Sequence, residues 1–317
     1  MSAGSPAEDI MQVSVIIPNY NHGPFLKERL ESVLQQNFQD FEVIILDDSS
    51  TDNSEEVIEQ YRNHPKVAQV VYNDMNSGST FIQWQRGMAL AKGEYIWIAE
   101  SDDVADIHFI EKMLLLLQDN KTGIVYCRTM QVDDAGNELG LNLWPDVLDD
   151  TRWTKPYTNT GTDELYNYFL YRNVIVNASS AIVKRDKALP AIEYVLQQKM
   201  QYCGDWLFYF NILTSSNISY LPEALNFQRY HAHTTRYNKT TGAELQRITE
   251  CIDCIKAIAT FLNVKINWEN EQYNWIYEYA SGRALLSRKM TDRLVQKNGS
   301  RKTYKAFFKS LLGMWGQ

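Results

Sequence analysis

The feature that most constrains the fold is a regular alternation of apolar runs and amphipathic stretches between residues 13 and 99. Apolar runs of roughly four to eight residues between polar breaks are typical of buried strands, whereas apolar residues at helical spacing indicate helices. The predicted strands are 13–17, 41–46, 67–72 and 95–99. The predicted helices are about 25–36, 55–61 and 82–91, the last with Gly93 as its C-cap. This order predicts an α/β fold with a mostly parallel central sheet flanked by helices.

Polar loops follow three of these strands, at residues 18–22, 47–52 and 100–103. Because ligands of parallel sheets bind outside the carboxyl ends of the strands, we expect the loops to converge on one crevice. In the third loop, several carboxylates directly follow a buried strand, which is costly unless they are neutralised. A divalent cation shared with a substrate diphosphate would neutralise them. The alternative is that the acids cap the next helix, but one Asp would suffice for that.

The pattern after residue 110 is more mixed. The predicted elements are a strand at 123–127, a hairpin that turns at 134–137, a helix at 205–213, edge strands at 218–221 and 225–230, and helices beyond 240, including one at about 268–294. A loop rich in Trp and Asp, at 143–160, is long enough to indicate function.

Charge and hydropathy exclude several classes of protein. The formal net charge of −8 argues against a nucleic-acid partner. No apolar run approaches the roughly 20 residues that a membrane-spanning helix needs. Residues 1–12 read as a flexible N-terminus without the apolar core of a signal peptide. We therefore expect a cytoplasmic protein.

Four segments occur in the order and spacing of a known family: residues 13–21 (VSVIIPNYN), 34–38 (LQQNF), 42–52 (EVIILDDSSTD) and 91–103 (AKGEYIWIAESDD). With them the chain resembles family 2 glycosyltransferases of the GT-A fold. The resemblance implies one Rossmann-like domain over 13–238, with a nucleotide-binding half at about 13–110 and an acceptor half at about 111–238. A helical extension at 239–317 lies outside the resemblance.

The resemblance assigns nucleotide contacts in the first half of the chain. Pro18, Asn19 and Tyr20 match the loop that lies against the base, with Tyr20 suited to stack on it. Asp48 matches the acid that binds uracil in relatives that use UDP-sugars, and uracil offers an N–H donor to such a carboxylate. Arg86 lies where relatives often have a residue near the nucleotide, although a solvated helix face is the alternative. A helix cap is the alternative for the acids at 47–48.

The resemblance also implies a metal, Mn²⁺ or Mg²⁺. Glu100, Ser101 and Asp102 match the Asp-x-Asp motif, with Glu in place of the first Asp. Asp102 is the expected principal ligand, and these three residues are also expected to contact the nucleotide. His231 is a further candidate ligand, because it matches the family's Arg-x-His segment. A structural imidazole is the alternative for His231.

The resemblance implies an inverting transfer in which a carboxylate takes the proton of the acceptor hydroxyl. Asp205 matches that base, within a Gly-Asp pair at a predicted helix start. The alternative for Asp205 is a helix N-cap. No Gln-x-x-Arg-Trp motif of processive members follows it, so one sugar is expected per encounter.

The predicted function is therefore transfer of a sugar from a nucleotide donor, with UDP expected, to a glycan or lipid-linked hydroxyl in cell-surface polysaccharide synthesis. A sugar-phosphate nucleotidyltransferase is an alternative, but the loop after the first strand has one Gly and no Arg. A non-catalytic nucleotide-binding scaffold is another. The amphipathic, basic segment 301–317 either packs on the protein or contacts a membrane surface peripherally. Sequence patterns do not specify the donor sugar, the acceptor or the oligomeric state.

Overall fold

A computed structural model describes residues 12–117, 119–231, 241–273 and 275–276. The chain divides into two compact units, residues 1–232 and 233–317. The predicted boundary at residue 238 lies outside the described residues.

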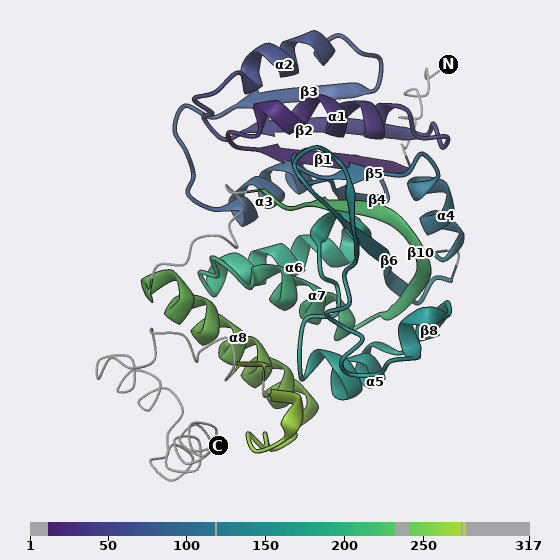
Figure 1. Ribbon diagram of the computed structural model, residues 1–317, viewed down its shortest axis with the longest axis vertical. Helices are drawn as coiled ribbons and strands as arrows, with labels where there is room; N and C mark the ends of the chain where they lie inside the picture. The colour runs from purple at the N-terminus through teal and green to yellow at the C-terminus, as the bar shows by residue number, and fades with distance from the viewer. Residues whose placement is uncertain (1–11, 118, 232–240, 274, 277–317) are drawn as a thin grey trace, which may run out of the picture. The chain divides into compact units, whose positions relative to one another are not determined.

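The first unit is built on one ten-stranded sheet (Figure 1). Its main path is β3-β2-β1-β4-β9-β6-β10-β5, while β7 pairs with β6 and β8 with β10. The strands are β1 (Val13–Asn19), β2 (Phe41–Asp47), β3 (Val67–Tyr72), β4 (Tyr95–Ile98), β5 (Val104–Ala105), β6 (Thr122–Val132), β7 (Glu138–Leu141), β8 (Tyr157–Asn159), β9 (Ala181–Lys184) and β10 (Asn217–Arg229). Strands β1 to β4 are mutually parallel, and β9 is antiparallel to both β4 and β6. Since β10 is parallel to β6, the long strands β6 and β10 end at the same edge as β1.

Helices cover both faces of the sheet, which is why its first strands read as continuous apolar runs. The helices of this unit are α1 (Gly23–Leu34), α2 (Ser54–Tyr61), α3 (Thr80–Leu90), α4 (Phe109–Leu115), α5 (Gly161–Glu164), α6 (Arg185–Gln197) and α7 (Gly204–Leu213). Val13, Val15 and Ile17 pack in one buried cluster with residues of α1, α2 and α4. Helices α3, α6 and α7 pack against one another, α3 contacts β1, and α7 contacts β6. The predicted mostly parallel sheet flanked by helices is confirmed.

Three local predictions differ from the structure. The two predicted edge strands are one strand, β10, which bulges near residues 221–226 and pairs with β6 on one side and with β5 and β8 on the other. Gly93 is not a helix cap, because α3 ends at Leu90 and its C-cap is Ala91. Instead, a Cβ at Gly93 would lie 2.6 Å from the Ser14 nitrogen, so glycine lets this segment approach the start of β1. Helix α6, which contains Pro190, was not predicted.

The second unit contains α8 (Thr241–Leu262) and a 3-10 helix (Glu271–Tyr273). Four isoleucines at helical spacing on α8 are buried: Ile248, Ile252, Ile255 and Ile258. The helix predicted from residue 268 is wrong at its start, where a turn precedes the 3-10 helix, and most of its remainder lies outside the described residues. Residues 301–317 also lie outside them. None of the helices in the described part of the chain is long and apolar enough to cross a membrane.

Candidate active site

Side chains tie the loops after β1 and β2 together at the carboxyl edge of the sheet. The Asn19 amide donates to Asp47 Oδ2 (2.7 Å), and the Asn21 backbone N–H donates to Ser50 Oγ (2.9 Å). Asn21 and Ser49 adopt left-handed backbone conformations (φ 56° and 63°), which are uncommon outside glycine. These contacts confirm that the first two loops converge.

The predicted base-binding residues differ in how accessible they are. Pro18 lies within β1 opposite Leu46, and Asn19 is buried with its amide engaged in the loop. The Tyr20 side chain is 45% exposed at the same edge of the sheet. Tyr20 is therefore the one of the three whose ring is open to a ligand.

Asp48 lies buried at the centre of a network of neutral donors. Its Oδ1 accepts hydrogen bonds from Asn73 Nδ2 (2.5 Å), the Ser77 backbone (2.9 Å) and Gln83 Nε2 (2.8 Å). Its Oδ2 accepts one bond from Ser77 Oγ (2.8 Å). Of these four bonds three are on Oδ1 and one is on Oδ2, so Oδ2 is the oxygen whose second lone pair is left for a ligand donor. Asp48 caps no helix, because α2 begins after Asn53.

Arg86 joins this network at its surface. The exposed Arg86 guanidinium donates to Asn73 Oδ1, and the amide of Asn73 donates to Asp48. Arg86 is therefore connected to Asp48 through one side chain. Sequence reasoning missed Asn73, although it directly follows β3 at the edge where ligands bind.

Two buried arginines support the acidic loop after β4. Arg29 Nε donates to the Glu100 carbonyl (2.8 Å), and one guanidinium nitrogen lies 3.9 Å from Asp103 Oδ2. Arg229 Nε donates to the Asp102 carbonyl (3.1 Å). The protein thus supplies two cations of its own to the acidic cluster. Sequence reasoning missed Arg29, which stands on the inner face of α1 at helical spacing from apolar residues.

Asp103 fixes the loop from the other side. It accepts hydrogen bonds from Ser179 Oγ (2.6 Å), Asn177 Nδ2 (2.9 Å) and the Arg229 backbone (3.1 Å). Burial, followed by the negative charge of Asp102, raises the pKa of Asp103 to about 6. These bonds tie the loop after β4 to the segment at 177–179 and to the end of β10, so Asp103 orients the loop.

Glu100 points toward α3. Its Oε1 accepts a hydrogen bond from Trp84 Nε1 (2.9 Å). Burial, with a smaller contribution from Asp102, raises the pKa of Glu100 to about 8. Neighbouring positions on α3 therefore reach both acidic loops, Gln83 to Asp48 and Trp84 to Glu100.

One carboxylate and two imidazoles come together at the ends of β1, β4 and β10. His22, Asp102 and His231 each offer a ligand atom, and these atoms all lie within 4.8 Å of one another. His231 Nε2 lies 3.1 Å from Asp102 Oδ2, and His22 Nδ1 lies 2.8 Å from Ser101 Oγ. Among the described residues, this group brings together the predicted ligands Asp102 and His231 but does not include Glu100.

The electrostatics of this triad favour an ionised carboxylate. Burial alone would raise the pKa of Asp102. The hydrogen bond from His231 and the proximity of His22 outweigh burial and lower this pKa. A carboxylate and two imidazoles are all metal-ligating groups, and imidazole suits transition metals better than Mg²⁺, which prefers oxygen. The donor set therefore fits a divalent cation without specifying which one. Sequence reasoning missed His22, whose only signal was its place in the loop after β1.

Asp205 is the second residue of α7. The N-cap of this helix is Cys203, so Asp205 is not the N-cap that was the alternative. Its Oδ2 accepts a hydrogen bond from Asn173 Nδ2 (3.0 Å) and its Oδ1 one from the Trp206 backbone (2.8 Å). A Cβ at Gly204 would lie 2.6 Å from the Phe81 ring, so glycine allows the start of α7 to pack on α3.

Asp205 is linked to both the acidic loop and the loop at 143–160. Burial, then the charges of Asp205 and Glu100, raise the pKa of Tyr209, so both carboxylates lie close to one phenol. On the other side, Trp144 Nε1 donates to the Asn173 carbonyl (3.1 Å), and Arg172 lies 4.3 Å above the Trp144 ring. Trp144 remains 37% exposed, next to the residue that holds Asp205.

Comparison with known proteins gives the family. The family model "Glycosyl transferase family 2" matches residues 14–188, more than half of the chain. The chain therefore belongs to glycosyl transferase family 2, as the resemblance predicted. The structure of Staphylococcus aureus TarS residues 1–349 in complex with UDP matches with a TM-score of 0.57 and 20% identity, covering 88% of this chain and 73% of that one. This match supports the GT-A fold.

Two curated relatives illustrate the range of similarity. The glycosyltransferase GlyG of Streptococcus pneumoniae is 33% identical over 123 residues, which is 39% of this chain and 40% of that protein. The poly(ribitol-phosphate) beta-glucosyltransferase of Bacillus spizizenii is 24% identical over 291 residues, which is 86% of this chain and 44% of that protein. The chain thus spans less than half the length of either relative.

Proposed function

We propose that the protein is an inverting, metal-dependent glycosyltransferase that moves a sugar from a UDP-sugar to a hydroxyl of a cell-surface glycan, lipid-linked or polyol-phosphate acceptor. The observation that carries this proposal is the meeting of His22, Asp102 and His231 at the edge where the nucleotide loops converge. Two similar proteins support the donor and the acceptor class. One was solved with UDP, and the other is named for a poly(ribitol-phosphate) acceptor.

In the proposed mechanism the first half of the chain holds the donor. Tyr20 stacks on the base, and the open position on Asp48 Oδ2 accepts its ring N–H. Asp102, His22 and His231 hold the cation, which when bound would supply positive charge to the departing diphosphate. Glu100 is a less direct participant, because its carboxyl group is engaged by Trp84.

The second half performs the proton transfer. Asp205 accepts the proton of the acceptor hydroxyl while that oxygen attacks the anomeric carbon and the bond to the diphosphate breaks. Asn173 holds the Asp205 carboxylate through one oxygen. Trp144, exposed beside Asn173, offers an aromatic face for the acceptor.

Asp205→Asn tests the base directly. We expect it to bind UDP as the wild type does and to lose about 10²- to 10⁴-fold in transfer rate, the usual contribution of a general base. Asp186→Asn is the matched control, since Asp186 is the second residue of α6 and should leave the rate unchanged. A fully active Asp205→Asn protein would mean that the base lies elsewhere.

Assays of the wild-type protein also distinguish the two alternative functions. A sugar-phosphate nucleotidyltransferase would release pyrophosphate from a nucleoside triphosphate, and family membership does not favour it. A non-catalytic scaffold would bind UDP without transfer in the wild type. The cytoplasmic location stays a prediction, and both alternatives for residues 301–317, packing on the protein and peripheral membrane contact, stay open.

A further inference from the structure

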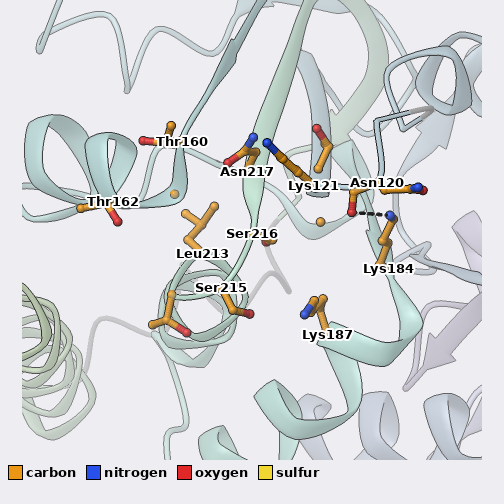
Figure 2. Close-up of a pocket in the computed structure, with 14 residues that line it drawn as sticks. Asn120, Lys121, Thr160, Thr162, Lys184, Lys187, Leu213, Ser215, Ser216 and Asn217 are labelled. Atoms are coloured by element: carbon orange, nitrogen blue, oxygen red, sulfur yellow. Dashed lines mark hydrogen bonds between the residues drawn. The ribbon is translucent and has the colours of Figure 1, made fainter.

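A polar cavity of about 390 Å³ lies at the edge of the sheet opposite the candidate active site (Figure 2). The residues that line the cavity come from the starts of β6 and β10 and from the end of the antiparallel strand β9. Asp102 and His231 instead follow β4 and β10, which end at the other edge of the sheet. The 13 residues of β10 run between the two regions, a length of roughly 40 Å at the usual rise per residue. The cavity is therefore separate from the nucleotide site.

The cavity lining is basic although the protein as a whole is acidic. Lys121, Lys184 and Lys187 line it together with Asn, Ser and Thr side chains, and its lining contains no Asp or Glu. Figure 2 shows these three lysines around the same space, with Lys184 bonded to the Asn120 carbonyl (3.1 Å). Within the described part of the chain, none of the three forms an ion pair. In a chain of net charge −8, such a concentration of unbalanced positive charge favours an anion.

The start of helix α6 adds to this preference for an anion. Lys184 is the N-cap of the 13-residue helix α6, and its first turn holds Arg185 and Lys187 beside one acidic residue, Asp186. Backbone N–H groups and the positive end of the helix dipole at a helix N-terminus favour a bound anion, whereas cations there are unfavourable unless an anion offsets them.

We propose that this cavity is a binding site for a phosphate group, held by Lys121, Lys184 and Lys187. Lysine binds phosphate as a point charge, and hydroxyl donors complete the contacts. Two sources carry this chemistry, a free phosphate ion and a phosphodiester of a polymeric acceptor. The site does not depend on the proposed transfer reaction.

Calorimetric titration of inorganic phosphate into the full chain, with a metal chelator present, tests the site. We expect one phosphate per chain in the wild type and at least about tenfold weaker binding in Lys184→Gln/Lys187→Gln. Lys199→Gln, at the opposite end of α6, removes the same charge and should change affinity less than about twofold.

A second titrant identifies the source. A short glycerol-phosphate oligomer that binds more tightly than inorganic phosphate assigns the site to a phosphodiester polymer, and the reverse order assigns it to the free ion. Circular dichroism checks that the variants fold, and Lys121→Gln replaces the double variant if that one does not. No phosphate binding by the wild type, or equal binding by the wild type and the folded lysine variants, would overturn the proposal. Neither result affects the Asp205 assay.

Discussion

The loops after β2 and β4 are both acidic, but different kinds of groups contact their carboxylates. Asp48 is surrounded by amide, backbone and hydroxyl donors, which are all neutral. Asp102 contacts His231, lies close to His22, and has a main chain held by Arg229. The first arrangement orients a carboxylate for one more hydrogen bond, while the second offers a carboxylate and two imidazoles to a cation. Under the proposed function, the same residue type serves base recognition in one loop and metal binding in the other.

Replacing Asp102 should have the largest effect. We expect Asp102→Asn to lose the metal response and about 10³-fold or more in transfer rate, because a cation supplies several kcal/mol of charge stabilisation to the leaving group. Initial rates across a Mn²⁺ titration measure this. If the variant keeps the metal dependence of the wild type, the two loops do not differ in the way described.

The variant His22→Ala tests whether His22, which sequence reasoning missed, takes part in metal binding. His22→Ala should weaken Mn²⁺ binding by about 10- to 100-fold, the usual range for a supporting contact and a lower limit for a true ligand. His64→Ala, on the far side of the nucleotide half between α2 and β3, is the matched control and should bind Mn²⁺ like the wild type. Equal Mn²⁺ affinity in both variants would remove His22 from the site.

Replacing Asp48 should affect nucleotide binding and leave metal binding unchanged, the opposite of replacing His22. Asp48→Asn is expected to weaken UDP binding about tenfold, the value of one lost hydrogen bond to a charged group, and to leave Mn²⁺ affinity unchanged. Isothermal titration with each ligand separates the two effects. A loss of metal affinity would contradict the division of roles between the loops.

The smallest effects should come from α3, where adjacent residues reach the two loops. Gln83→Leu removes a donor to Asp48 and should lower the free energy of unfolding by about 2 kcal/mol. Trp84→Phe removes a donor to Glu100 and should cost about 1 kcal/mol at pH 7, because a carboxyl group with a pKa of about 8 is mostly protonated and accepts a weaker bond. Urea unfolding measures both, and the reverse order would argue that Glu100 is ionised.

Local patterns were enough to predict the strands of the nucleotide half and the loops that follow them. The strands there are mostly apolar with isolated polar residues, and longer polar stretches begin where the strands end, so Asp48 and Asp102 could be found without long-range information. The partners of these residues could not. His22, Arg29 and Asn73 are ordinary in sequence and become important only because parallel strands bring their loops to one edge.

The acceptor half was harder to predict for physical reasons. Strand β10 is bulged, so its alternation is interrupted and it reads as two short strands. Helix α6 contains Pro190, a residue that normally argues against a helix. Asp205 was found through a two-residue motif, but the need for Gly204 became evident only from its packing against Phe81.

The central claim is that His22, Asp102 and His231 hold a cation that supports binding of a UDP-linked donor. The most direct measurement is the thermal stabilisation of the full chain by UDP, with Mn²⁺ and with chelator, in the wild type and in Asp102→Asn. We predict that Mn²⁺ increases the stabilisation of the wild type by UDP and leaves Asp102→Asn unchanged. Equal stabilisation by UDP with chelator and with Mn²⁺, or an equal Mn²⁺ response in both proteins, would contradict the account.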